Sequence, residues 1–144
     1  MLGTVEGDSI GIYLGNDATL DSGQEVVVGA NGVVSGGTGV ILYGFNSSII
    51  NYGLISVSNN GVFIYGANAS VTNHGVISAD NSAVVIIGAN AFVINSGLIS
   101  GGEFGVNVAA SAVVGEFRIL NHGTIEGANF GVFFGEPWGD GVSL

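Results

Sequence analysis

The acidic residues are the best candidates for chemistry in this chain, because three of them recur at nearly constant spacing: Asp80, Glu103 and Glu126. A glycosidase needs two carboxyl groups about 5 to 9.5 Å apart, one of which acts as an acid. Carboxylates in turns are more often simply solvated, where they help to keep a protein soluble. We therefore favour solvated residues here, and we keep carbohydrate binding or hydrolysis at this acidic corner as the alternative hypothesis.

Metal binding has one weak candidate. Asp17, Asp21 and Glu25 carry oxygen ligands of the kind that hold Ca²⁺. They form a single acidic loop, and the Gly-Gly-x-Gly-x-Asp repeat of calcium-binding solenoids does not occur in the chain. We expect no metal and no other cofactor, with calcium at this loop as the one exception to test.

The charge of the chain argues against several classes of partner. Lys and Arg together number 1 in 144 residues, and the formal net charge is −10. Nucleic-acid binding needs cations to neutralise phosphates, and an anionic membrane surface repels such a chain. A lyase that acts on uronates also needs cations near the substrate carboxylate. We therefore expect no nucleic acid, no membrane insertion and no enzymatic activity.

An internal repeat of 22 residues dominates the sequence. Asn51-Tyr-Gly-Leu-Ile-Ser recurs as Asn73-His-Gly-Val-Ile-Ser, as Asn95-Ser-Gly-Leu-Ile-Ser and, after 26 residues, as Asn121-His-Gly-Thr-Ile-Glu. Each copy also contains a second apolar element, such as Gly61-Val-Phe-Ile, at a fixed offset. Short alternating apolar runs between Gly, Asn, Ser and Asp are typical of strands separated by turns.

A unit this short buries its apolar face only by stacking on its neighbours. We therefore predict an all-β chain that forms a parallel β-helix, or β-solenoid, of about six coils of about 22 residues. Successive coils should lie about 4.8 Å apart. Residues 1–144 should form one domain, with 136–144 as a C-terminal cap or tail.

Alternation within the second element separates inward from outward side chains. Two of its rows are uniformly apolar and should face the core, so the row between them must face outward. This outward row and the residues just beyond it define a mostly aromatic and apolar strip, here called the outer strip: Tyr13, Ile41, Tyr43, Phe63, Tyr65, Val85, Ile87 and Phe133. A soluble monomer seldom exposes an apolar patch larger than a few hundred Å². Either a flanking segment covers the outer strip, or it contacts another copy, another surface protein or a polysaccharide.

One polar residue recurs in every full repeat, at Asn51, Asn73, Asn95 and Asn121. One amide per coil at a turn is what stacking of side-chain amides requires. We interpret these residues as a structural ladder rather than as a ligand site.

The pattern Asn-x-Gly-x-Ile-Ser/Glu, followed about eight residues later by Gly-Val-x-Ile-x-Gly, resembles the passenger repeats of bacterial autotransporters and filamentous-haemagglutinin-like exoproteins. The resemblance extends from Gly3 to about Gly135. It implies a right-handed parallel β-helix, export to the bacterial cell surface, and an adhesive or assembly role. That repeat is a scaffold in its family, so the resemblance specifies architecture rather than activity.

The two ends of the predicted stack are the remaining feature. Open strand edges normally need polar caps, and only Pro137 and Trp138 offer a cap, at the C-terminal end. Either the chain is part of a longer solenoid, or copies stack end to end as a filament-forming contact. We expect an extracellular structural module that is adhesive or self-assembling.

Overall fold

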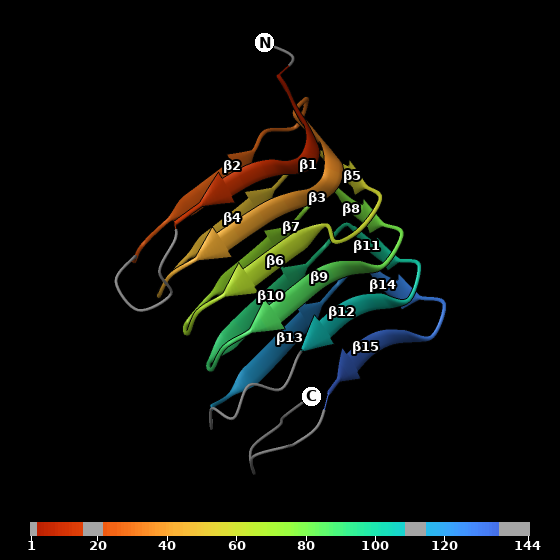
Figure 1. The fold of residues 1–144 in the computed structure, drawn as a ribbon. Helices are drawn as coiled ribbons and strands as arrows, with labels where there is room; N and C mark the ends of the chain where they lie inside the picture. The colour runs from red at the N-terminus through yellow and green to blue at the C-terminus, as the bar shows by residue number, and fades with distance from the viewer. Residues whose placement is uncertain (1–2, 16–21, 109–114, 136–144) are drawn as a thin grey trace.

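The computed structural model describes residues 3–15, 22–108 and 115–135, and every regular element in them is a β-strand. Parallel strands stack in successive coils, which makes the chain a β-solenoid of about five turns (Figure 1). The predicted all-β class and repeat architecture are confirmed. The handedness of the winding stays a prediction. The described residues contain no helix that could cross a membrane.

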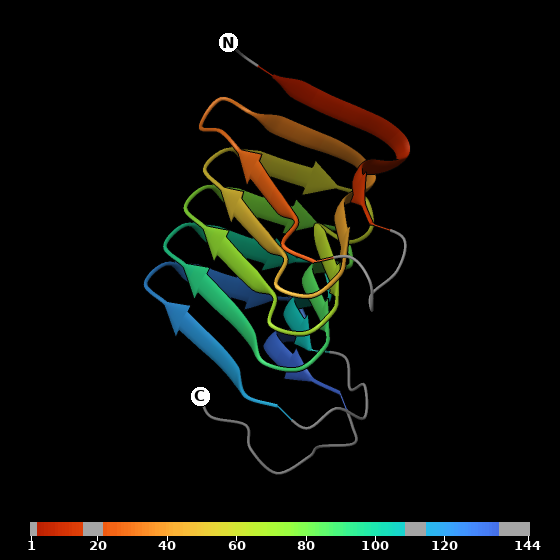
Figure 2. The ribbon, with the colours of Figure 1, turned by 90° about the vertical axis from the view of Figure 1, so that its left-hand side faces the viewer.

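Each complete coil has three sides. The first side belongs to a five-stranded parallel sheet (Figure 2), formed by β2 (Glu25–Val28), β4 (Ser48–Asn51), β7 (Ser70–Asn73), β10 (Ala91–Asn95) and β13 (Phe117–Asn121). The other two sides belong to one 10-stranded sheet that bends at the corner between them. Its second side contains β5 (Leu54–Val57), β8 (Val76–Ala79), β11 (Leu98–Gly101) and β14 (Thr124–Gly127). Its third side contains β6 (Val62–Tyr65), β9 (Ser82–Ile87), β12 (Phe104–Val108) and β15 (Phe130–Phe134).

Two longer strands, β1 (Thr4–Leu14) and β3 (Val33–Tyr43), cross both the second and the third side. The first part of β3 pairs with β5 and its last part with β6. Among the described residues β1 has no accompanying strand on the first side, where β2 is the outermost strand. The prediction of about six coils counted β1 as a full coil, whereas it supplies two of the three sides.

The core is a column of apolar side chains that repeats from coil to coil. Inward residues of the middle coils are fully shielded from solvent, as at Val40, Val62, Val84 and Val106 and at Leu42, Ile64 and Ile86, all 0% exposed. Burying one such side chain contributes roughly 1.5 to 3 kcal/mol. Because each coil covers its neighbour, this stabilisation comes from stacking rather than from a coil by itself.

A corner between the third and the first side requires a left-handed backbone. Asn46, Asn68 and Asn90 have φ values of 56°, 58° and 55°. Asn tolerates this region better than most residues because its short amide can hydrogen-bond locally. Here the amides bond to one another, from Asn68 Nδ2 to Asn46 Oδ1 at 3.1 Å and from Asn90 Nδ2 to Asn68 Oδ1 at 3.2 Å.

Candidate functional site

The outer strip lies on the third side of the stack and faces outward between the two buried rows. Tyr13 and Tyr65 are 51% and 41% exposed, while Tyr43 and Phe63 between them are half-buried. The rings of Tyr13 and Tyr43 lie 5.7 Å apart and those of Tyr43 and Tyr65 lie 5.5 Å apart, both tilted. Aromatic pairs at this distance add about 0.5 to 1.5 kcal/mol beyond their buried area. The tyrosines therefore form an ordered, solvent-facing ladder.

Val85 departs from the expected outer strip. It faces outward from β9 but is only 6% exposed. It lies in register between Phe63 and Asn107, both half-buried. Exposure is therefore lower than expected at Val85, whereas Ile87, in register with Tyr65, is half-buried. The aromatic side chains of the outer strip fall into two patches, one on either side of these two aliphatic residues.

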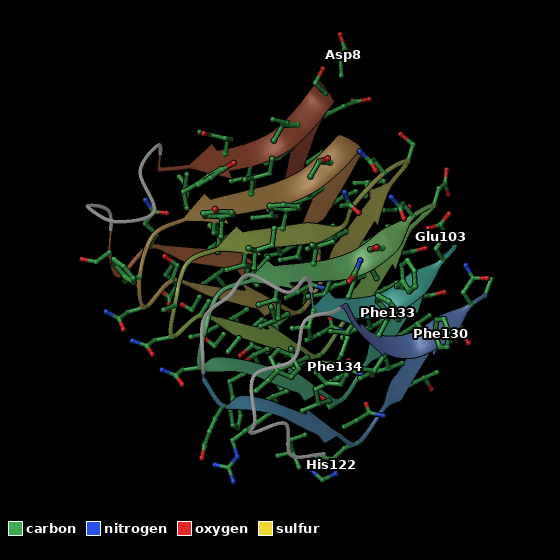
Figure 3. The ribbon with its side chains drawn as sticks, turned by 60° about the horizontal axis from the view of Figure 1, so that its bottom comes forward. Asp8, Glu103, His122, Phe130, Phe133 and Phe134 are labelled. Carbon is green, nitrogen blue, oxygen red and sulfur yellow. The ribbon has the colours of Figure 1, made fainter. Side chains whose placement is uncertain are left out.

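The second patch is a phenylalanine cluster at the C-terminal end of the third side, where Figure 3 shows Phe130 and Phe133 close together. Phe104 stacks on Phe130 with centroids 6.2 Å apart and planes 3° apart. Phe133 lies 4.9 Å from Phe104 and 5.4 Å from Phe130. The sequence interpretation included Phe133 but missed its two partners. The repeated tripeptide Phe-Gly-Val at Phe104 and Phe130 was the available signal.

The repeated Asn residues form a buried ladder on the first side. Asn51, Asn73 and Asn95 are 0% exposed, and each donates its Nδ2 to the Oδ1 of the next Asn at 2.8 Å. Each Nδ2 also donates to two backbone carbonyls, for Asn73 those of Gly75 and Leu98. No buried polar side-chain atom among the described residues lacks a partner. The three buried amides are therefore fully used by the fold and offer no free groups to a ligand.

The three candidate carboxylates lie on three successive coils. Backbone hydrogen bonds place Glu103 between Asn81 and Asn129 on the neighbouring coils. Glu126 lies instead on β14, in register with Ser100, whose hydroxyl donates to Glu126 Oε1 at 3.0 Å. Asp80, Glu103 and Glu126 are all exposed. They therefore lie on the surface rather than in an enclosed acidic site.

A cavity of about 370 Å³ lies at the opposite, N-terminal end, between β1 and β2. Its lining is mostly apolar and backbone and includes Val5, Ile12, Val27 and Val28. None of the residues that line it is ionisable. The cavity is therefore the open end of the core rather than a site with acid–base groups.

The proposed calcium loop falls largely outside the described residues, since Asp17 and Asp21 both do, as does the predicted cap or tail 136–144. Glu25 lies on β2 and is exposed, with Ser48 Oγ 3.5 Å from its carboxylate. Within the described part of the chain, no group of three acidic or His side chains could hold a metal ion.

Comparison of the chain with protein-family models, curated proteins and solved structures gives no match. The repeat architecture is therefore established by the fold itself. Membership of the autotransporter-like exoproteins stays a prediction from the repeat pattern.

Proposed function

We propose that this chain is a non-enzymatic structural module that associates with other copies of itself through the outer strip. The observation that carries this proposal is the ladder of Tyr13, Tyr43 and Tyr65, in which ordered aromatic rings face solvent. Tyr is favoured at protein interfaces, because it offers a large contact area at a low cost in side-chain entropy. Exposed aromatic patches on soluble proteins typically mark contact surfaces.

The finer parts of the proposal come from the repeat pattern. The resemblance to autotransporter passenger repeats supports a right-handed winding and a place on the outside of a bacterial cell. An adhesive role would use the same surface toward another surface protein or a polysaccharide. The chain's net charge of −10 supports the exclusion of nucleic acid and anionic membrane as partners.

Replacing both Phe63 and Tyr65 with Ser should weaken self-association at least tenfold, as measured by sedimentation velocity over a range of concentrations. The reason is the loss of two aromatic contacts, each typically worth more than 1 kcal/mol at the centre of an interface. Thermal unfolding should show that the coils remain folded, because Tyr65 is 41% exposed and Phe63 is half-buried.

The matched control is Tyr52→Ser, which removes an aromatic ring that is 48% exposed on the surface but outside the outer strip. Tyr52 stacks on His74 at 4.9 Å, so this variant tests whether loss of any exposed ring is enough. Unchanged sedimentation of the double variant, or an equal effect of the control, would reject the outer strip as the contact surface.

A further inference from the structure

We propose that copies of this chain stack head to tail, with β14 and β15 of one copy pairing in parallel with β1 of the next. This inference rests on the proposed function, because it specifies one way in which copies associate. It concerns the ends of the stack, whereas the proposed function concerns its outer side.

The C-terminal edge of the stack leaves core residues partly uncovered. Ile125 on β14 and Val132 on β15 are half-buried, although the equivalent Ile99 and Val106 one coil earlier are 0% exposed. Phe130 is 52% exposed. No described strand pairs with the outer edge of β14 or β15. An edge of this kind is a template for another strand.

The N-terminal edge presents the complementary surface. Among the described residues β1 pairs only with β3, which leaves its outer edge open. Val5 and Tyr13 on β1 are 41% and 51% exposed, and Ile12 is half-buried. On the second and third sides the two edges are cross-sections of the same repeat, so their strands run in the same direction there.

The internal register predicts which residues would meet. Ile125 of one copy would lie beside Val5 of the next copy, because the two residues belong to the same row of the stack. Val132 would lie beside Ile12 for the same reason. Phe133 would face Tyr13 on the outside. The two aromatic patches, which lie at opposite ends of the third side, would therefore meet at the junction. In Figure 3, Phe133 lies toward the C-terminal end of the stack and Asp8, a residue of β1, lies at the other end.

Head-to-tail contact is favoured over contact between two like ends. All strand pairs in the described stack are parallel. A head-to-tail junction repeats this pairing, whereas joining two C-terminal edges would make it antiparallel. On the first side, β13 of one copy and β2 of the next would be separated by the width of one strand, because β1 has no described strand beside it there. Strand pairing across the junction would therefore occur only on the second and third sides.

One contact opposes the junction and makes it testable. Glu126 occupies the same row as Glu6, and both are exposed. Across the junction these carboxylates would face each other at the strand spacing of about 4.8 Å. Like charges directly opposite one another on adjacent strands are destabilising, and opposite charges are stabilising.

The test is a charge-swap cycle on the full chain, read out by sedimentation velocity. Glu6→Lys and Glu126→Lys should each strengthen self-association about fivefold, because each converts a repulsive pair into an attractive one. The double variant E6K/E126K restores repulsion, and its association should fall back to about the unmodified level. The control E6K/D80K has the same net charge as the double variant, but Asp80 lies two coils away from the C-terminal edge. It should keep the gain of E6K.

The outcomes separate this inference from the proposed function. If E6K/E126K associates more strongly than either single variant, the effect is one of net charge and the head-to-tail junction is wrong. If the charge swaps change nothing while the Phe63/Tyr65 variant abolishes association, copies meet side by side and only this inference fails. If the unmodified chain stays monomeric and no charge variant associates, both proposals fail.

Discussion

Replacing Asn73 with Ala is expected to lower the free energy of unfolding by about 3 kcal/mol. Asn73 is 0% exposed, and its amide makes hydrogen bonds to Asn51, Asn95, Gly75 and Leu98. Alanine removes all four bonds and leaves several buried polar groups short of a partner. Each buried group without a partner costs about 1 to 3 kcal/mol. The measurement is chemical denaturation followed by circular dichroism.

The matched control is Asn121→Ala, at the exposed end of the same ladder. Asn121 accepts a bond from Asn95 Nδ2 and bonds locally to Gly123, where water can replace what is lost. We expect a loss of about 1 kcal/mol or less at this position. Equal losses for the two variants would show that burial of the ladder does not determine its contribution to stability.

Replacing Gly75 with Ala is the second change with a large expected effect, a loss of about 3 kcal/mol. A methyl group on Gly75 would overlap the carbonyl oxygen of Gly53 and lie 2.7 Å from the carbonyl carbon of Tyr52. Both atoms belong to the backbone of the neighbouring coil, which cannot move without disturbing the stack. Gly53, Gly97 and Gly123 are equally confined.

Gly29→Ala is the control for this substitution, because a methyl group there meets no atom within 4 Å. Its free energy of unfolding should change by no more than about 0.5 kcal/mol. Thermal denaturation of both variants checks the pair. A Gly75→Ala variant as stable as Gly29→Ala would show that neighbouring coils can separate locally at this corner.

The parts of the fold that were predictable from sequence are those that repeat without variation. Asn51, Asn73 and Asn95 recur every 22 residues, and the structure places them one above another with hydrogen bonds between their amides. The alternation of inward and outward rows follows from the geometry of a strand, and burial of Val62 and Ile64 on either side of Phe63 agrees with it.

Other features of the fold could not be predicted from the 22-residue repeat alone. The alternation along β9 predicts that Val85 faces outward, but alternation does not determine how far a side chain is covered, and Val85 is only 6% exposed. The ladder of Asn46, Asn68 and Asn90 was missed because a Gly-x-Asn turn by itself does not reveal a left-handed backbone. The extent of β1 was misjudged because its sequence matches parts of a coil but lacks the strand of the first side.

The proposed function rests on positions at which the 22-residue repeats within one chain differ from one another. The positions that repeat in every coil serve the stacking of one coil on the next. The hydrogen bonds of Asn73 and the close contacts around Gly75 are examples. The residues left for interaction are the exposed aromatic rings and the partly uncovered rows at the two ends. This distribution is the basis of the proposed assembly role.

Sedimentation velocity of the unmodified chain tests this account most directly. If the exposed rings and open edges serve self-association, the mean sedimentation coefficient should rise steadily with protein concentration, with species well above the 14.4 kDa of one chain. A single species of monomer mass at every concentration would contradict the proposed function.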